Sequence, residues 1–415
     1  MNPCSLECLQ EPLVLPDKSQ VWLMMVGCYE LQEIGTRLGR LELFPIRVPD
    51  IRSSHYRSIP LQIPEPSFVH AKGMVSAANV TSSSSSSSLS GVLDGKWIKA
   101  HPSSTTSCIN ESSFYFAAAH SSGHISIYSL TMGDHDDGDK IPIQMHLAAS
   151  SENVPSSTHA DPSPLCLSLS WNTSEILDGA SSNSIVSSYS NGTVKVHECL
   201  RTGNSEDSSH HMYLVERASW VAHTMFTSPA EVWSAAFLGS SNNNSAECQA
   251  VMTGGDDGKL KLWDTRMTTR PMQVLNHFDA GVTVVSPHPR NPNLVACGSY
   301  DETMCLYDIR FLNPKKPLGR SAPLGGGIWR IKWHPFDDDR VLVAAMHGGC
   351  RIVKIDEMED NSCVFLATKQ FTEHKSMAYG ADWLVCSHPT REGYFEAAAS
   401  CSFYDKALYL WDTVV

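Results

Sequence analysis

Short runs of alternating apolar and polar residues recur along this chain, and each run follows a tight polar turn. Residues 252–264, 296–308 and 399–412 have this shape most clearly, and each segment ends in Trp-Asp or Tyr-Asp. In Leu260-Lys-Leu-Trp263 the alternation places successive side chains on opposite faces of a β-strand. Trp263 and Tyr307 are separated by the roughly 40–45 residues that are typical of one propeller blade. The pattern therefore predicts a series of four-stranded blades.

Weaker copies of the same pattern extend the series to six blades. They lie at residues 117–128, 187–197 and 342–353. In the last copy, His347 stands at the turn position that an Asp holds elsewhere. A shorter strand, often ending in Trp, is expected ahead of the copies, at residues 91–97, 165–171, 231–237, 281–286, 327–333 and 379–383.

A seventh blade fits the N-terminal part, with strands at 21–29 and 38–44 but no visible opening strand. One blade cannot bury both its faces alone, so we expect the blades to stack around a ring whose chain ends share a blade. The predicted fold is all-β, a single seven-bladed WD-repeat β-propeller over residues 1–415. The expected blades are 12–63, 91–145, 165–220, 231–275, 281–320, 327–370 and 379–415.

Polar stretches without core-forming capacity separate many of these strands. The stretch 81–90 is almost entirely serine. Such segments cannot bury enough apolar surface to fold by themselves. We predict flexible surface loops at residues 81–90, 132–140, 150–164, 203–211 and 240–246.

Composition narrows the classes of function. The formal net charge of −13 argues against binding of a nucleic-acid backbone, which needs clustered Lys and Arg. No apolar run approaches the roughly 20 residues that span a bilayer, and no basic segment precedes an apolar one at the N-terminus. The 13 cysteines are scattered and form no Cys-x-x-Cys pair. We predict a cytoplasmic protein with no membrane segment, no bound metal and no cofactor.

The acidic turn residues have an interpretation that needs no catalysis. Asp257, Asp301 and Asp405 each lie six residues before the Trp or Tyr that ends the next strand. In WD-repeats such an Asp bonds to a His from the preceding loop, and the expected partners are His223, His277 and His374. A buried carboxylate requires such hydrogen bonds because its desolvation is otherwise too costly.

The stretch 374–383 has more functional groups than the start of a blade requires. His374 and Ser376 are two residues apart, so in an extended loop they point to opposite sides and form no dyad without a bend. Tyr379 and Asp382 can donate and accept protons. A capped loop with a structural His is the alternative interpretation.

The stretch 325–335 begins with three glycines, which allow close approach of the backbone. Alternation places Trp329 and Ile331 on one face and Arg330 and Lys332 on the other, and a cation within a strand needs a partner. The sequence contains no nucleophile elbow, no His-Glu-x-x-His motif and no phosphate-binding glycine loop. These motifs alone favour an interaction scaffold.

Four stretches are similar to one particular WD-repeat family, the diphthine methyl ester hydrolases of diphthamide biosynthesis. They are residues 29–44, 91–97, 298–348 (in its parts 298–302, 326–335 and 346–348) and 374–383. The resemblance implies a carboxylic ester hydrolase that releases methanol from methylated diphthine on elongation factor 2. The loop between His223 and Glu231 is longer than expected for the family.

The resemblance also implies roles for particular residues. Ester hydrolysis needs a base, a nucleophile or an activated water, and donors for the oxyanion. The catalytic candidates are His374, His347, Ser376 and Asp382, with Arg330 or a glycine amide from 325–327 for the oxyanion. The trimethylammonium of the substrate favours aromatic faces and carboxylates. The candidates for these contacts are Tyr300, Trp329, Tyr379, Trp383, Glu302 and Asp382, and Arg330 is a further candidate for substrate binding. We expect 298–302, 326–347 and 374–383 to meet around one central opening.

A non-catalytic adaptor is the alternative, with a ubiquitin-ligase substrate receptor as its special case. Some receptors contain a Trp-Asp-x-Arg box, and residues 263–266 match it. Residues 307–310, Tyr-Asp-Ile-Arg, match more weakly. In this interpretation the partner is a ubiquitin-ligase adaptor.

Overall fold

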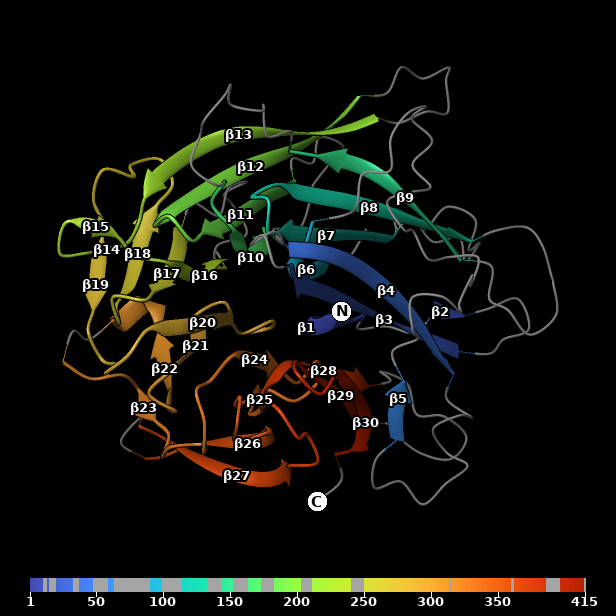
Figure 1. The fold of residues 1–415 in the computed structure, drawn as a ribbon. Helices are drawn as coiled ribbons and strands as arrows, with labels where there is room; N and C mark the ends of the chain where they lie inside the picture. The colour runs from blue at the N-terminus through green and yellow to red at the C-terminus, as the bar shows by residue number, and fades with distance from the viewer. Residues whose placement is uncertain are drawn as a thin grey trace.

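Seven antiparallel sheets are arranged in a ring in the computed structural model (Figure 1). The described residues are 1–9, 13–14, 20–32, 37–47, 59–62, 90–98, 114–132, 143–151, 163–172, 183–202, 211–239, 250–312, 315–359, 362–385 and 396–413. The ring confirms the predicted seven-bladed propeller. The loops predicted at 81–90, 132–140, 150–164, 203–211 and 240–246 lie outside the described residues except at their ends, so their flexibility stays a prediction.

Five blades consist of four consecutive strands each. The first consists of β6 (Val92–Ile98), β7 (Phe114–His120), β8 (Ile125–Met132) and β9 (Ile143–Ser150). The second consists of β10 (Cys166–Trp171), β11 (Asn183–Tyr189), β12 (Thr193–Thr202) and β13 (His211–Val221). The third consists of β16 (Val232–Phe237), β17 (Ala250–Gly255), β18 (Leu260–Asp264) and β19 (Gln273–Leu275). The fourth consists of β20 (Val282–Pro287), β21 (Leu294–Ser299), β22 (Met304–Asp308) and β23 (Gly319–Arg320). The fifth is β24 (Arg330–Trp333), β25 (Arg340–Ala344), β26 (Cys350–Glu357) and β27 (Cys363–Phe371).

The N-terminal blade has an opening strand that the sequence pattern did not reveal. This strand, β1 (Asn2–Cys8), pairs with β3 (Gln20–Leu31), which also pairs with β4 (Arg37–Arg47) and, at its start, with β2 (Leu13–Val14). The blade therefore opens ahead of the expected boundary at residue 12. Cys4, Leu6 and Cys8 are all buried, which is the reason for the pairing.

The last blade combines three C-terminal strands with one strand from the N-terminal part of the chain. Its strands are β28 (Ala378–Val385), β29 (Glu396–Ser402), β30 (Ala407–Asp412) and, outermost, β5 (Ile59–Gln62), which pairs with β30. The expectation that the N-terminal and C-terminal parts share a blade holds for residues 59–62, whereas residues 2–8 belong to the first blade. This pairing of β5 with β30 closes the ring and covers a sheet edge.

The first strands of the blades line the central channel. They contact one another in a closed circuit, β1, β6, β10, β16, β20, β24, β28 and back to β1. Apolar clusters fill the spaces between neighbouring blades; one of them contains Ile331, Trp333 and Val343. Alternation along β24 buries Ile331 and Trp333 between blades and leaves Arg330 and Lys332 on the opposite face, as predicted; this face lines the channel.

A small hairpin interrupts the connection between β13 and β16. It consists of β14 (Thr224–Met225) and β15 (Ser228–Pro229) and accounts for the unexpected length of the loop after His223. At its tip Phe226 is 98% exposed and has a φ of 56°, a left-handed conformation that is uncommon outside glycine. Among the described residues, no helix is both long enough and apolar enough to span a membrane.

Candidate functional site

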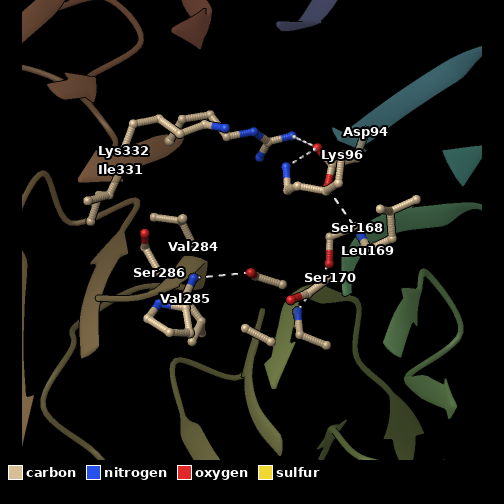
Figure 2. A pocket seen from close by; sticks show the side chains of 15 residues that line it. Asp94, Lys96, Ser168, Leu169, Ser170, Val284, Val285, Ser286, Ile331 and Lys332 are labelled. Atoms are coloured by element: carbon tan, nitrogen blue, oxygen red, sulfur yellow. Dashed lines mark hydrogen bonds and ion pairs between the residues drawn. The ribbon is translucent and has the colours of Figure 1, made fainter. Parts of the chain in front are cut away.

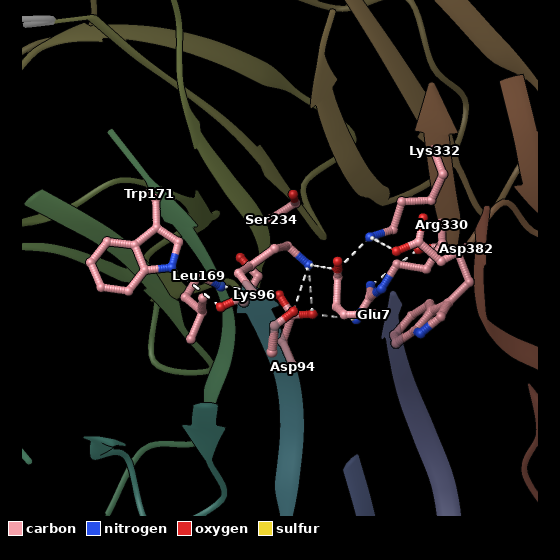
Figure 3. A network of polar contacts seen from close by, with 12 residues as sticks. Glu7, Asp94, Lys96, Leu169, Trp171, Ser234, Arg330, Lys332 and Asp382 are labelled. Carbon is pink, nitrogen blue, oxygen red and sulfur yellow. Dashed lines mark hydrogen bonds and ion pairs between the residues drawn. The ribbon is translucent and has the colours of Figure 1, made fainter. Parts of the chain in front are cut away.

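Six charged side chains from four inner strands meet in the channel (Figure 3). The anions are Glu7, Asp94 and Asp382, and the cations are Lys96, Arg330 and Lys332. Lys96 Nζ lies 2.5 Å from Glu7 Oε1 and 3.1 Å from Asp94 Oδ1, and Glu7 also pairs with Lys332. We call this group the channel network. Its equal numbers of opposite charges allow it to lie largely out of water, with Lys96 the most exposed member at 28%.

Some members of the channel network also tie one inner strand to the next. Asp382 Oδ2 accepts the Cys8 amide at 2.8 Å, and Asp94 Oδ2 accepts the Leu169 amide at 3.1 Å. Serines do the same farther round the ring: Ser168 Oγ accepts the Ala235 amide and Ser234 Oγ accepts the Val285 amide, each at 3.1 Å. Asp94 and Asp382 thus place a charge where other blades have a hydroxyl.

Burial changes the acid–base behaviour of this network. For Asp382 the removal of water is the largest effect, and with the nearby Glu7 charge it raises the pKa to about 6 although Lys332 acts in the opposite direction. Burial also disfavours the charged ammonium of Lys332, but Asp382 and Glu7 outweigh it and raise the Lys332 pKa. Asp382 is therefore a carboxylate that changes protonation near neutral pH.

A cavity of about 130 Å³ lies beside the network within the channel (Figure 2). Its walls come from β6, β10, β16, β20 and β24. The polar lining consists of Asp94, Lys96, Arg330, Lys332 and the hydroxyls of Ser168, Ser170, Ser234 and Ser286. The cavity has room for several waters or one small group.

Aromatic side chains follow one another along the end of the channel at which the inner strands begin, which we call the front rim. Trp233 and Tyr379 are second residues of inner strands and Trp329 immediately precedes one, while Tyr300 and Phe403 follow strands that run the opposite way. Trp329 lies 5.0 Å from Tyr379, between ring centroids, and Tyr379 lies 5.4 Å from Phe403. With Tyr29, 4.9 Å from Phe403, these rings form the aromatic row.

Arg330 connects the aromatic row with the channel network. Its guanidinium carbon is 5.5 Å from the centroid of the Trp329 ring, and Nη2 is 3.3 Å from Asp94 Oδ1. The partner expected for this strand cation is therefore Asp94, which lies on β6. A ligand group bound at the aromatic row would therefore lie close to the Arg330 guanidinium.

The three stretches expected to meet around the opening do so. The Ile328 amide donates to the Ser299 carbonyl at 2.9 Å, and the Ala378 amide donates to the Met346 carbonyl at 3.0 Å. Gly327 packs so closely that an added Cβ would be 3.1 Å from the Tyr300 ring. Of the expected substrate contacts, Tyr300, Trp329, Arg330 and Tyr379 are brought together here.

His374 and Ser376 do not form a pair in the structure. His374 Nδ1 and Nε2 lie 2.8 Å and 2.7 Å from the hydroxyls of Ser402 and Ser400, and burial lowers its pKa to about 4. Ser376 Oγ instead accepts the Tyr404 amide at 3.1 Å. The structure therefore gives His374 a structural position, which removes the geometric basis for it as the base that activates Ser376.

The equivalent histidine in an earlier blade shows the same arrangement. His223 bonds to Asp257 through Nδ1 and to Thr253 through Nε2, both at 2.7 Å, and Trp263 donates to the same threonine. The predicted His223–Asp257 pair is confirmed. The His277–Asp301 pair is wrong, because His277 Nδ1 contacts the Tyr307 hydroxyl.

Asp301 has other partners, which explains that difference. It accepts hydrogen bonds from the Thr303 hydroxyl and from Arg320 Nη2, at 2.6 Å and 3.0 Å. The third expected pair, His374 with Asp405, is joined through Ser402, whose hydroxyl bonds to both.

Trp383 and Glu302 lie away from the aromatic row. Trp383 is 2% exposed, donates to the Lys332 carbonyl at 2.9 Å and packs against His334, so it belongs to the core between blades. Glu302 has a φ of 69° and stands in its turn where Gly258 stands in the preceding blade. The structure therefore places neither side chain against the other substrate candidates.

His347 is exposed on the β25–β26 turn, beside the glycine loop. An added Cβ on Gly326 would be 3.1 Å from the His347 amide nitrogen and 2.8 Å from the Gly348 nitrogen. Among the described residues, no group of three His, Cys, Asp or Glu side chains is arranged to hold a metal ion.

Glu7, Lys96 and Trp233 are site residues that the sequence analysis did not select. The alternation of Cys4, Leu6 and Cys8 was the available signal for Glu7. Lys96 and Trp233 lie within predicted inner strands, but only the closed ring shows which side chains face the channel or its rim.

The closed circuit of inner strands and the structural His223 pair define a WD-repeat β-propeller. The family model described as "WD domain, G-beta repeat" matches residues 217–264 and 269–308. The chain belongs to the family of proteins named diphthine methyltransferase. It is 31% identical to the diphthine methyltransferase homolog of Dictyostelium discoideum, over 78% of this chain and 76% of that protein.

Two further relatives have the same name. The diphthine methyltransferase of Schizosaccharomyces pombe is 30% identical, and the alignment covers 78% of this chain and 79% of that protein. The human diphthine methyltransferase is 36% identical over 53% of this chain and 44% of the human protein. The chain thus spans about three quarters of two relatives and less than half of the human one.

Proposed function

We propose that this protein is a carboxylic ester hydrolase of diphthamide biosynthesis. Its substrate is the methyl ester of methylated diphthine on elongation factor 2, and its products are diphthine and methanol. Membership of the diphthine methyltransferase family supports the substrate. The observation that supports the site is the continuous path from the aromatic row through Arg330 to Asp382 in the channel network. A cytoplasmic location remains our prediction from the sequence.

The reaction consumes one water. The oxygen of water attacks the ester carbonyl carbon while a base accepts one of its protons, and the carbonyl oxygen becomes an oxyanion. The bond from the carbonyl carbon to the methoxy oxygen then breaks, and the methoxy group leaves with the proton as methanol. No methyl acceptor and no oxidant or reductant are required.

The channel network contains a candidate for the base and a candidate for the group that stabilises the oxyanion. Asp382 is our candidate for the base, because its carboxylate is ionised above about pH 6 and is held at the channel by Cys8 and Lys332. Arg330 is our candidate for the oxyanion, since a guanidinium in a site largely removed from water stabilises developing negative charge strongly. His347 is exposed on the β25–β26 turn, and its amide and the amide of Gly348 lie beside Gly326, where we expect the protein substrate to approach.

The name of the relatives describes a methyl transfer, whereas our proposal is hydrolysis. The two reactions differ in the fate of the methyl group: transfer places it on an acceptor, and hydrolysis releases it as methanol. The purified chain should release methanol from elongation factor 2 that carries methylated diphthine, in the absence of any added methyl donor or acceptor.

One variant tests a residue of the channel network, and a second, control variant changes a residue outside it. Arg330→Met should lower methanol release by about 100-fold if the guanidinium stabilises the oxyanion. Ser376→Ala should leave it unchanged, because that hydroxyl is bonded to the Tyr404 backbone outside the path. Absence of methanol release from the wild-type protein, with elongation factor 2 bound, overturns the hydrolase proposal.

That overturning result would favour the adaptor, which one observation supports. Arg266 and Arg310 pair with Asp264 and Asp308 at equivalent positions of adjacent blades, at the ends of β18 and β22. Phe311, which is 75% exposed, follows directly. Binding of a ubiquitin-ligase adaptor that is lost in Arg266→Ala and Arg310→Ala together is the test of this second function.

A further inference from the structure

Three rings of the aromatic row form a cluster rather than a line. Trp233 lies 5.9 Å from Tyr300 and 5.7 Å from Trp329, between centroids, and Tyr300 lies 6.1 Å from Trp329. The interplanar angles of 87°, 62° and 43° show that the three planes are inclined to one another. All three side chains are only partly buried, so part of each remains open at the front rim.

Two carboxylates lie beside this cluster. Asp256 Oδ1 accepts the Trp233 indole N–H at 3.1 Å, and the Asp256 amide donates to the Glu231 carbonyl at 2.9 Å. The pKa of the Tyr300 phenol is raised chiefly by burial, and the charges of Tyr379, Asp256 and Glu231 raise it further. The negative potential of both carboxylates therefore reaches the aromatic ring.

Neither carboxylate is neutralised within the described part of the chain. No ion pair of Asp256 or Glu231 is found there, whereas the nearby Arg330 is paired with Asp94 and also donates to the Trp329 carbonyl. Apart from Arg330, whose guanidinium carbon lies 5.5 Å from the centroid of the Trp329 ring, the cluster combines electron-rich ring faces with two carboxylates that have no ion pair in the described residues. This combination attracts a weakly hydrated organic cation.

We propose that Trp233, Tyr300 and Trp329, with Asp256 and Glu231, form a binding site for a methylated ammonium group. The inference rests on the proposed function in one respect, because the methylated diphthine side chain has a trimethylammonium beside its ester. It assigns the carboxylate partners of that cation to Asp256 and Glu231, so that Asp382 remains free for the reaction. A methylated ammonium suits the site better than a primary one, since it loses little hydration when it rests on aromatic faces.

Binding of choline by the full chain tests the site without any turnover. The matched probe is 3,3-dimethylbutan-1-ol, which has the same shape with a carbon in place of the charged nitrogen. Titrations followed by the tryptophan indole NMR signals should show choline binding at least tenfold more tightly than the neutral alcohol. Equal affinities for the two probes overturn the proposal.

Substitutions assign the effect to particular side chains. Trp233→Leu should weaken choline binding by about tenfold. The double variant Asp256→Asn with Glu231→Gln should reduce the preference for choline while keeping the acceptor for the Trp233 indole. Tyr404→Ala, an exposed aromatic outside the cluster, should bind choline as the wild type does. An unchanged preference in the double variant contradicts the role of the carboxylates, even if Trp233→Leu fails to fold.

The two proposals fail in different ways. Preferential choline binding without methanol release would overturn the hydrolase and leave the ammonium site standing. Methanol release without any preference for choline would overturn the ammonium site and leave the hydrolase standing.

Discussion

Arg330 and Asp94, which are 236 positions apart in the chain, lie 3.3 Å apart between a guanidinium nitrogen and a carboxylate oxygen inside the central channel. Their side chains are 11% and 4% exposed, so the pair is largely removed from water. The pair joins β24 to β6, two strands that are not neighbours around the ring.

Removing Asp94 should destabilise the protein. Asp94→Asn removes the charge partner of Arg330 and one of the two charge partners of Lys96, which keeps Glu7, and an uncompensated buried charge costs about 3–5 kcal/mol. We expect the free energy of unfolding, measured with denaturant, to fall by about 3 kcal/mol. Asp264→Asn is the control, because its partner Arg266 is 69% exposed and an exposed pair contributes at most about 1 kcal/mol. Equal losses in the two variants would contradict the role given to burial.

The pH dependence of methanol release should follow Asp382. A base must be ionised to accept a proton, and burial raises the pKa of this carboxyl to about 6. The value of kcat/KM should therefore rise with pH through about 6 and level off above it. Asp382→Asn should lower kcat strongly and abolish this limb of the profile. A wild-type profile that is flat between pH 5 and 7 assigns the base to another residue.

His374→Ala should affect stability rather than chemistry. Both ring nitrogens are bonded to buried serine hydroxyls, so the variant removes one hydrogen bond from Ser400 and one from Ser402, which keep their contacts with Trp411 and Asp405. We expect a loss of about 2 kcal/mol in the free energy of unfolding, similar to that of His223→Ala, which removes the equivalent contacts. Methanol release per folded molecule should stay near the wild-type rate, and a large fall at full folding would restore His374 as a catalytic candidate.

Glu396 should contribute to stability only above acid pH. Burial raises its pKa, but hydrogen bonds from His334, Arg340 and Thr413 outweigh it and lower the pKa from 4.5 to about 2. Because the folded pKa is depressed, the stabilisation is complete above pH 4.5 and is lost as pH falls toward 2. Glu396→Gln should cost on the order of 2 kcal/mol at pH 7 and much less at pH 2.5. A loss in the free energy of unfolding that is the same at both pH values would show that the charge of Glu396 is not its cause.

Phe226 should contribute to recognition of a protein substrate. The side chain is almost fully exposed at the tip of the β14–β15 hairpin, and the connection that contains it leads into Trp233 at the front rim. Phe226→Ser should raise KM for intact elongation factor 2 about fivefold and leave turnover of a short modified peptide unchanged. Phe311→Ser, an exposed aromatic beyond the end of β22, is the control and should change neither.

The periodic parts of the molecule could be predicted from the sequence. Alternation in 329–333 placed Trp329, Ile331 and Trp333 on one face of the strand. In the structure Ile331 and Trp333 lie in the core, whereas Trp329, which precedes the strand, is only partly buried at the front rim. The spacing of His374 and Ser376 also indicated that the two side chains do not form a dyad, and in the structure they have different partners. Local period determines such features, so no distant contact was needed to infer them.

The contacts across the channel could not be predicted in this way. Asp382 bonds to the Cys8 amide across 374 positions, and Lys332 pairs with Glu7 across 325. Such pairs depend on how the ring closes and not on any local pattern. The strand with Glu7 was missed because its seven residues show only a short alternation and no blade-ending Trp-Asp.

The outermost strand of the last blade, β5, comes from residues 59–62, whereas the strand it completes ends at Asp412. During synthesis these early residues therefore stay unpaired with β30 until residues 407–412 have been made. Before that point the last blade lacks its outermost strand. An unpaired strand edge is a template for pairing with other chains, so β5 protects the blade from misassociation as soon as it docks.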